Sequence, residues 1–105
     1  MEDNLRVIFW NVRGLNNAAK RAAVQSVIAL ASPCIVCLQE SKLALVSSVL
    51  VCETLGPAFD KFFLLPVEGT RGGIILAWNS DRVALSNPSI GDHHVSAVVT
   101  ATAGG

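Results

Sequence analysis

Two short apolar segments, LRVIFWN (residues 5–11) and CIVCLQE (residues 34–40), decide the fold. Residues 5–10 are dense in β-branched and aromatic side chains, which is typical of a strand. Residues 34–38 are all apolar and predict a second strand. Because side chains alternate between the two faces of a strand, residues 5–10 are apolar on both faces. We therefore expect residues 5–10 to form an interior strand.

The segment between these strands has the pattern of an amphipathic helix. Its apolar residues recur at i, i+3, i+4 and i+7 and predict one buried stripe: Val24, Val27, Ile28 and Ala31. Asn16 or Asn17 can cap the start, because an asparagine side chain accepts a hydrogen bond from a free backbone N–H. Gly14, in the preceding loop, can take a positive φ. Pro33 ends the helix.

A strand, a helix and a second strand make a βαβ unit, whose strands run parallel through a right-handed crossover. The carboxyl ends of parallel strands lie at one edge of the sheet. Asn11 follows the first strand directly, and Glu40 follows the second by two residues. We therefore expect Asn11 and Glu40 to lie close together, at the edge where α/β sheets commonly bind ligands.

The remainder of the chain predicts a second helix and four more strands. The turn at residues 68–72 favours an antiparallel hairpin between two of these strands. The expected fold class is α/β (α+β), with one mixed sheet of about five or six strands and two helices on one face. The expected ranges are a helix at 43–55 and strands at 60–65, 73–78, 83–85 and 94–100.

Composition limits the classes of protein to consider. The 105 residues suffice for one domain, and 51% of them are apolar, 15% are charged and the mean hydropathy is +0.51. These values exclude intrinsic disorder. Eight basic residues balance eight acidic ones, so no general positive field would hold nucleic acid. The apolar excess indicates a surface that a further sheet or a partner chain would cover.

Cysteine usage and the amino terminus predict an intracellular protein. Three cysteines is an odd number, and the first residues are acidic, unlike a secretory signal. Residues 22–39 carry no charge, but Pro33 divides them into two short elements and argues against a membrane span. The Cys34-x-x-Cys37 spelling invites a redox or zinc interpretation. Inside a strand these two side chains would face opposite ways, so we expect core cysteines.

Glu40 is the most informative polar residue, because it follows a run of apolar residues at the mouth of a buried strand. It could cap a loop, pair with Lys42 or Arg13, or bind a cation. Mg²⁺ prefers oxygen ligands and keeps several waters, so one or two carboxylates suffice to hold it. Spacing alone does not choose among these roles.

Three motifs in order resemble the endonuclease/exonuclease/phosphatase superfamily, the DNase I-like fold. They are VIFWNVRGL (residues 7–15), IVCLQESK (residues 35–42) and RGGIILAW (residues 71–78). They are most similar to the N-terminal part of the endonuclease domains of plant LINE-type retrotransposons. The resemblance implies a partial DNase I-like sandwich, with residues 1–105 as the truncated N-terminal half of such a domain.

The resemblance also implies a Mg²⁺-dependent phosphodiesterase that cleaves DNA in the nucleus. Glu40 matches the family's metal ligand, and Asn11 matches a residue that orients the metal and the scissile phosphate. Lys42 and, more weakly, Arg71 are candidates for contact with the substrate backbone, although either can be a solvated surface charge. Mg²⁺ is the cofactor and DNA the partner that this resemblance implies.

The departures from the family pattern predict little or no activity. The family also uses a catalytic histidine, an Asp-x-Asn pair and a late Asp-His pair; no Asp-x-Asn occurs here, and Asp92-His93-His94 stands too early. The first hypothesis is therefore a fragment with half of the metal site. The second is a non-catalytic α/β module that docks a partner chain through an exposed sheet face. The third is a complete small enzyme that uses Asp92 and His93 with Glu40.

Overall fold

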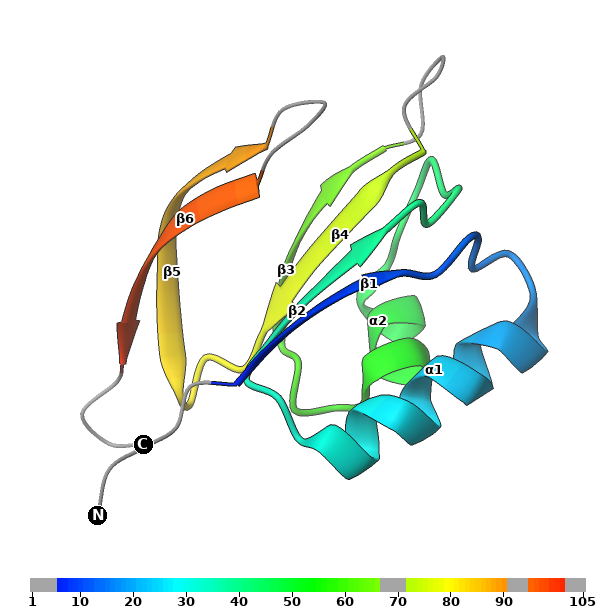
Figure 1. Cartoon of the computed structure of the whole chain (residues 1–105), viewed down its shortest axis with the longest axis horizontal. Helices are drawn as coiled ribbons and strands as arrows, with labels where there is room; N and C mark the ends of the chain where they lie inside the picture. Colours follow the sequence, from blue (N-terminus) through cyan, green and yellow to red (C-terminus); the bar gives the residue numbers. More distant parts are fainter. Residues whose placement is uncertain (1–5, 67–71, 91–94, 102–105) are drawn as a thin grey trace.

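The computed structural model describes residues 6–66, 72–90 and 95–101 (Figure 1). They form an α/β fold with two helices, a mixed four-stranded sheet of order β1-β2-β4-β3 and a separate hairpin, β5-β6. The Cα radius of gyration is 13.2 Å, as expected for a compact chain of this length. The elements in order are β1 (Val7–Asn11), α1 (Ala18–Ala31), β2 (Ile35–Gln39), α2 (Ser48–Leu55), β3 (Lys61–Leu65), β4 (Ile74–Trp78), β5 (Val83–Ile90) and β6 (Val95–Ala101).

The βαβ unit predicted from the sequence is present. β1 and β2 run parallel, in a register that pairs Val7 with Ile35 and Asn11 with Gln39. Asn17 caps α1, since its side-chain oxygen accepts hydrogen bonds from the backbone N–H groups of residues 19 and 20. The helix ends at Ser32, just before Pro33, as expected.

Both helices cover one face of the four-stranded sheet, as predicted, and enclose the larger core (Figure 1). The buried side chains that the sheet contributes to this core come from β2 and β4: Val36, Leu38, Ile75 and Ala77. From α1, Val24 and Ile28 are fully buried, whereas Val27 is 45% exposed. The predicted stripe was thus too wide, because Val27 lies about 60° around the helix axis from Val24, at the margin of the contact.

The expectation that residues 5–10 form an interior strand is wrong. In the described part of the chain β1 pairs with β2 alone and forms an edge of the sheet. Ile8 and Trp10 pack toward the helices, while Val7 and Phe9 on the other face remain 41% and 63% exposed. Apolar residues on both faces of a strand indicate only what packs above and below it. They do not show whether another strand pairs with each of its two edges, and for this reason the prediction of an interior strand failed.

The second helix is shorter than predicted, because it begins at Ser48 and not at residue 43. Ser47 sets this start: its hydroxyl accepts a hydrogen bond from the N–H of Leu50, at 3.2 Å. Residues 43–46 precede the helix as a loop, in which Leu43 is buried and Leu45 is exposed.

The six strands form two sheets, which corrects the expected single sheet. β3 and β4 pair antiparallel, as predicted, and β4 also pairs antiparallel with β2. At Asn79 the chain turns: its N–H bonds to the carbonyl of Cys34 at 3.0 Å, and its carbonyl accepts from Val83 at 3.1 Å. β5 therefore leaves the sheet, and Val83 and Leu85 pack over the face opposite the helices, in a smaller core. The hairpin stands apart from the main sheet in Figure 1.

Cys34 and Cys37 are core cysteines, as predicted, whereas Cys52 is exposed. Cys34 and Cys37 are buried, and burial raises the pKa of the Cys37 thiol to about 11. The two residues do not face opposite ways as expected: both belong to the smaller core, because Cys34 precedes β2 and escapes its alternation. Within residues 6–66, 72–90 and 95–101, no helix has the length and apolar character needed to cross a membrane.

Candidate functional site

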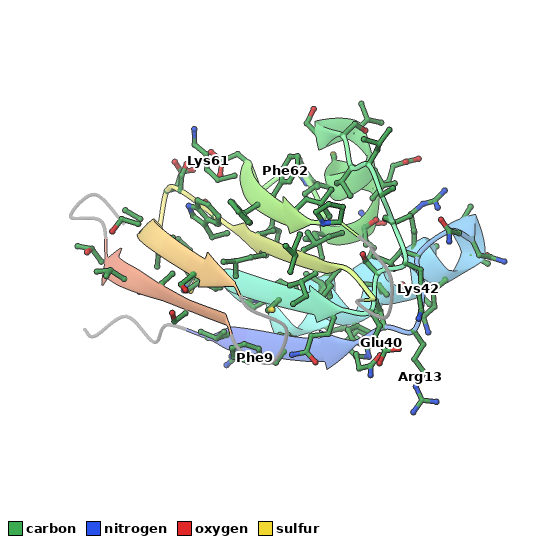
Figure 2. The ribbon with its side chains drawn as sticks, turned by 90° about the horizontal axis from the view of Figure 1, so that it is seen from above. Phe9, Arg13, Glu40, Lys42, Lys61 and Phe62 are labelled. Atoms are coloured by element: carbon green, nitrogen blue, oxygen red, sulfur yellow. The ribbon has the colours of Figure 1, made fainter. Side chains whose placement is uncertain are left out.

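The candidate site lies just beyond the carboxyl ends of β1 and β2, where Figure 2 shows Arg13, Glu40 and Lys42 together. The loop after β1 runs beside the loop after β2, and backbone hydrogen bonds join the two loops. The N–H groups of Val12, Gly14 and Leu15 donate to the carbonyls of residues 39, 40 and 41 at 3.0, 2.7 and 2.9 Å. The parallel pairing is therefore extended past the strands and fixes the two loops to each other.

On its other side, the loop after β2 is bonded to the start of β4. The N–H of Ser41 donates to the carbonyl of Gly73 at 3.1 Å, and that of Lys42 donates to Gly72 at 2.7 Å. Ser41 is fully buried between these segments. Glu40 thus sits in the middle of three backbone segments, two of which come from distant parts of the sequence.

The side chains of Asn11 and Glu40 meet, as the βαβ geometry predicts. The amide nitrogen Nδ2 of Asn11 donates to Oε2 of Glu40 in a short hydrogen bond. The amide oxygen of Asn11 accepts from the backbone N–H of Arg13 at 3.2 Å, which holds the amide in this orientation. Lys42 Nζ lies 3.7 Å from Oε1 of Glu40, so both carboxylate oxygens have a partner. Pairing with Lys42, one of the roles expected for Glu40, is therefore observed.

Three residues of this site have left-handed backbones that sequence reasoning missed. Arg13, Glu40 and Lys42 have φ values of 56°, 55° and 63°. Each such non-glycine residue costs roughly 1–3 kcal/mol and persists where its surroundings fix it, commonly at functional sites. The hydrogen bonds described above provide that fixation. Gly14 has φ 103°, as predicted.

A basic hollow of about 620 Å³ lies between the loop after β1 and the start of α1, and Lys42, the ion-pair partner of Glu40, lines it. Among its described lining residues three are cationic and none is acidic, a charge balance that favours an anion. The hollow was not predicted from the sequence, because its cations come from three separate segments. The lining residues are Arg13, Gly14, Asn16, Asn17, Ala19, Lys20 and Lys42.

The donor groups present fit a weakly held Mg²⁺. The Glu40 side chain is 44% exposed, and Mg²⁺ needs one or two carboxylates while waters or phosphate oxygens complete its shell. In the described segments no three His, Cys, Asp or Glu side chains come together to hold a metal. Glu40 would therefore supply the one carboxylate, and its present neighbour Lys42 would compete with the ion.

Other candidate residues lie outside the described residues: Arg71, Asp92, His93 and His94. Their roles stay predictions. Gly72 is a close neighbour of Glu40 that a sequence signal could have revealed, since the Gly72-Gly73 pair stands at the entry of a strand, where glycine marks a close backbone approach.

Comparison of the whole chain with protein-family models and with curated proteins found no match.

Proposed function

We propose that the rim at Asn11 and Glu40 is the metal-binding half of a DNase I-like phosphodiesterase site. Residues 1–105 would then correspond to the N-terminal half of such a domain, with the helix-covered sheet as one layer of its sandwich. The observation that carries this proposal is the hydrogen bond between the Asn11 amide and the Glu40 carboxylate, from residues 29 positions apart.

Each residue of the rim has a chemical task under this proposal. Glu40 holds Mg²⁺, which when bound supplies positive charge for the phosphoryl oxygens of the transition state. The Asn11 amide orients the carboxylate and can bond a phosphate oxygen without repelling it. Lys42, which pairs with Glu40 here, would serve as a point-charge donor to the same phosphate when Glu40 holds the ion.

DNA is the substrate class that the surrounding charges favour. The basic hollow is lined by Arg13, Lys20 and Lys42, and Lys42 also pairs with Glu40, so a nucleic-acid backbone bound at Glu40 would have cations near its flanking phosphates. Phosphate contacts of this kind release counterions, so binding should weaken steeply as salt rises. Arg71 remains a proposed further contact from the neighbouring segment.

The chain by itself should cleave slowly or not at all. Positioned general acid and base groups contribute about 10²–10⁴-fold to a rate, and the sequence has no Asp-x-Asn pair. Its two histidines are adjacent, at positions 93 and 94. Cation and DNA binding are therefore the activities that this chain would retain.

The test measures Mn²⁺ binding, by electron paramagnetic resonance, for the wild-type chain, Glu40→Gln and the control Glu53→Gln. Glu53 is exposed on α2, so its replacement removes the same charge without changing the rim. We expect Glu40→Gln to weaken Mn²⁺ binding at least tenfold and Glu53→Gln to leave it unchanged. Equal affinities for all three chains would refute the cation site.

A plasmid-nicking assay with Mg²⁺ separates the fragment from a complete enzyme. We expect nicking close to the background for the wild-type chain and for Glu40→Gln. Robust cutting that is lost in both Glu40→Gln and His93→Ala would show that the chain is a complete nuclease, and would refute the fragment proposal.

A second candidate function, docking of a partner chain, is favoured by the exposed side chains of β1. Val7 and Phe9 lie on the face opposite the helices, beside the smaller core, and remain 41% and 63% exposed. A partner polypeptide with an apolar strand would cover them and pair with the edge of β1. Strong binding of an apolar dye that falls in Phe9→Ser supports this candidate, and a chain that binds no dye contradicts it.

A further inference from the structure

Gly72 lies so close to Glu40 that a Cβ atom at position 72 would press on it. A Cβ atom at position 72 would lie 3.0 Å from Cγ, 3.2 Å from Cα and 3.4 Å from Cβ of Glu40. The contacts at 3.0 and 3.2 Å are tighter than ordinary van der Waals contact, so an alanine at position 72 requires Glu40 to shift by a few tenths of an ångström. The three atoms nearest to this Cβ position all belong to Glu40.

The Glu40 backbone has little freedom to move away from such a side chain. Its carbonyl accepts from Gly14 at 2.7 Å, and the following Ser41 is bonded to Gly73 and Leu15. The left-handed conformation of Glu40 further limits its adjustment. The contact with Cα at 3.2 Å needs a small shift of the backbone, whereas the closer contact with Cγ is relieved by moving the Glu40 side chain beyond Cβ, which carries the carboxylate.

We propose that Gly72 is a positioning residue for the Glu40 carboxylate. The absence of a Cβ at position 72 leaves room for the Glu40 side chain in the conformation that meets Asn11, and the Gly72 carbonyl accepts a hydrogen bond from the backbone N–H of Lys42. The importance of this position for metal binding rests on the proposed function, whereas its effect on the Asn11–Glu40 contact does not.

The first test follows the Asn11 side-chain amide by ¹H–¹⁵N nuclear magnetic resonance in the wild-type chain, Gly72→Ala and the control Gly56→Ala. A proton donated to a carboxylate resonates downfield of its geminal partner. We expect this separation to collapse in Gly72→Ala. It should persist in Gly56→Ala, since Gly56 has φ 103° and open space around it, so that alanine there strains the backbone without touching Glu40. An unchanged Asn11 signal in Gly72→Ala overturns the proposal.

The second test measures Mn²⁺ affinity of the same variants. We expect Gly72→Ala to weaken binding at least fivefold and Gly56→Ala to leave it unchanged. A wild-type chain that binds no Mn²⁺ refutes the proposed cation site, while the Asn11 signal still decides the role of Gly72. Weaker binding with an unchanged Asn11 signal overturns the positioning role.

A double-mutant comparison covers the case in which Gly72→Ala is unstable. Glu40→Ala removes the Cγ atom that a Cβ at position 72 would meet first. We therefore expect Gly72→Ala to lower the melting temperature less in the Glu40→Ala background than in the wild-type chain. If the single variant Gly72→Ala does not fold, we expect the double variant to fold. An equal effect in both backgrounds overturns the proposal.

Discussion

Replacing Asn11 by aspartate tests the geometry of the rim most directly. The substitution keeps the size of the side chain but exchanges the N–H donor for a second carboxylate facing Glu40. At neutral pH two like charges then stand at hydrogen-bond distance. The variant Asn11→Ala removes the hydrogen bond without adding a charge and is the matched control.

The expected loss of stability follows from the contacts. Two unit charges about 3 Å apart repel by roughly 1.4 kcal/mol in a medium as polar as water, and by more where the dielectric constant is lower. The Glu40 side chain is 44% exposed and Lys42 Nζ is 3.7 Å away, so the repulsion stays near this lower value. A hydrogen bond worth about 1 kcal/mol is also lost. We expect Asn11→Asp to lose about 2 kcal/mol at pH 8 and Asn11→Ala about half of that.

The assay is urea denaturation of the wild-type chain and both variants at pH 8 and at pH 4. At the lower pH one of the two facing carboxyl groups can hold a proton and donate it to the other, so the repulsion disappears. The penalty of Asn11→Asp should therefore be largest at high pH and fade on acidification, whereas that of Asn11→Ala should change little. Identical penalties for both variants at both pH values would show that residue 11 does not face the carboxylate.

Three further predictions concern the framework. The hydroxyl and the N–H of Ser80 both donate to the Asp60 carboxylate and lower its pKa. This contact therefore stabilises the fold fully at pH values above the ordinary pKa of an aspartate, and the stabilisation is lost as the pH falls through the lowered pKa. Ser80→Ala should accordingly reduce the melting temperature at pH 7 and have no effect in strong acid. In a thiol titration with a chromogenic disulfide, the exposed Cys52 should react at once, whereas the buried Cys37 should react only after the chain unfolds. Equal reaction rates for the two thiols would contradict the burial of Cys37. Leu38→Ala should cost about 2–5 kcal/mol in urea denaturation, because the side chain is fully buried in the larger core; a loss below about 1 kcal/mol would contradict that packing.

The part of the fold that could be predicted from the sequence depends on local patterns. The βαβ unit follows from two apolar runs around an amphipathic segment, and its parallel pairing then brings Asn11 to Glu40. The two asparagines Asn16 and Asn17 likewise indicated where α1 begins, and the structure selects Asn17 as the cap. Each of these inferences depends on residues that are close in the sequence, or on the single arrangement of the βαβ unit that a right-handed crossover permits.

The rest depends on information that no single segment contains. The edge position of β1 is decided by which strands pair laterally, and the separation of the hairpin is decided at Asn79, which is hydrogen-bonded to Cys34 just before β2 and to Val83 at the start of β5. The left-handed backbones of Glu40 and Lys42 have no signature in residue type, because glycine would be the usual occupant. The glycine pair at residues 72–73 was visible in the sequence, but only the structure shows that Glu40 is the residue that Gly72 approaches.

The hydrogen-bonded loops of the rim have a consequence for how a ligand would be received. The amide protons of Val12, Gly14, Leu15, Ser41 and Lys42 are all engaged by carbonyls of neighbouring segments. These amides should therefore exchange with deuterated solvent as slowly as those of the flanking strands, although they belong to connecting segments. An arriving ion or ester would meet a surface whose conformational entropy was already lost during folding, and little further ordering would oppose its association.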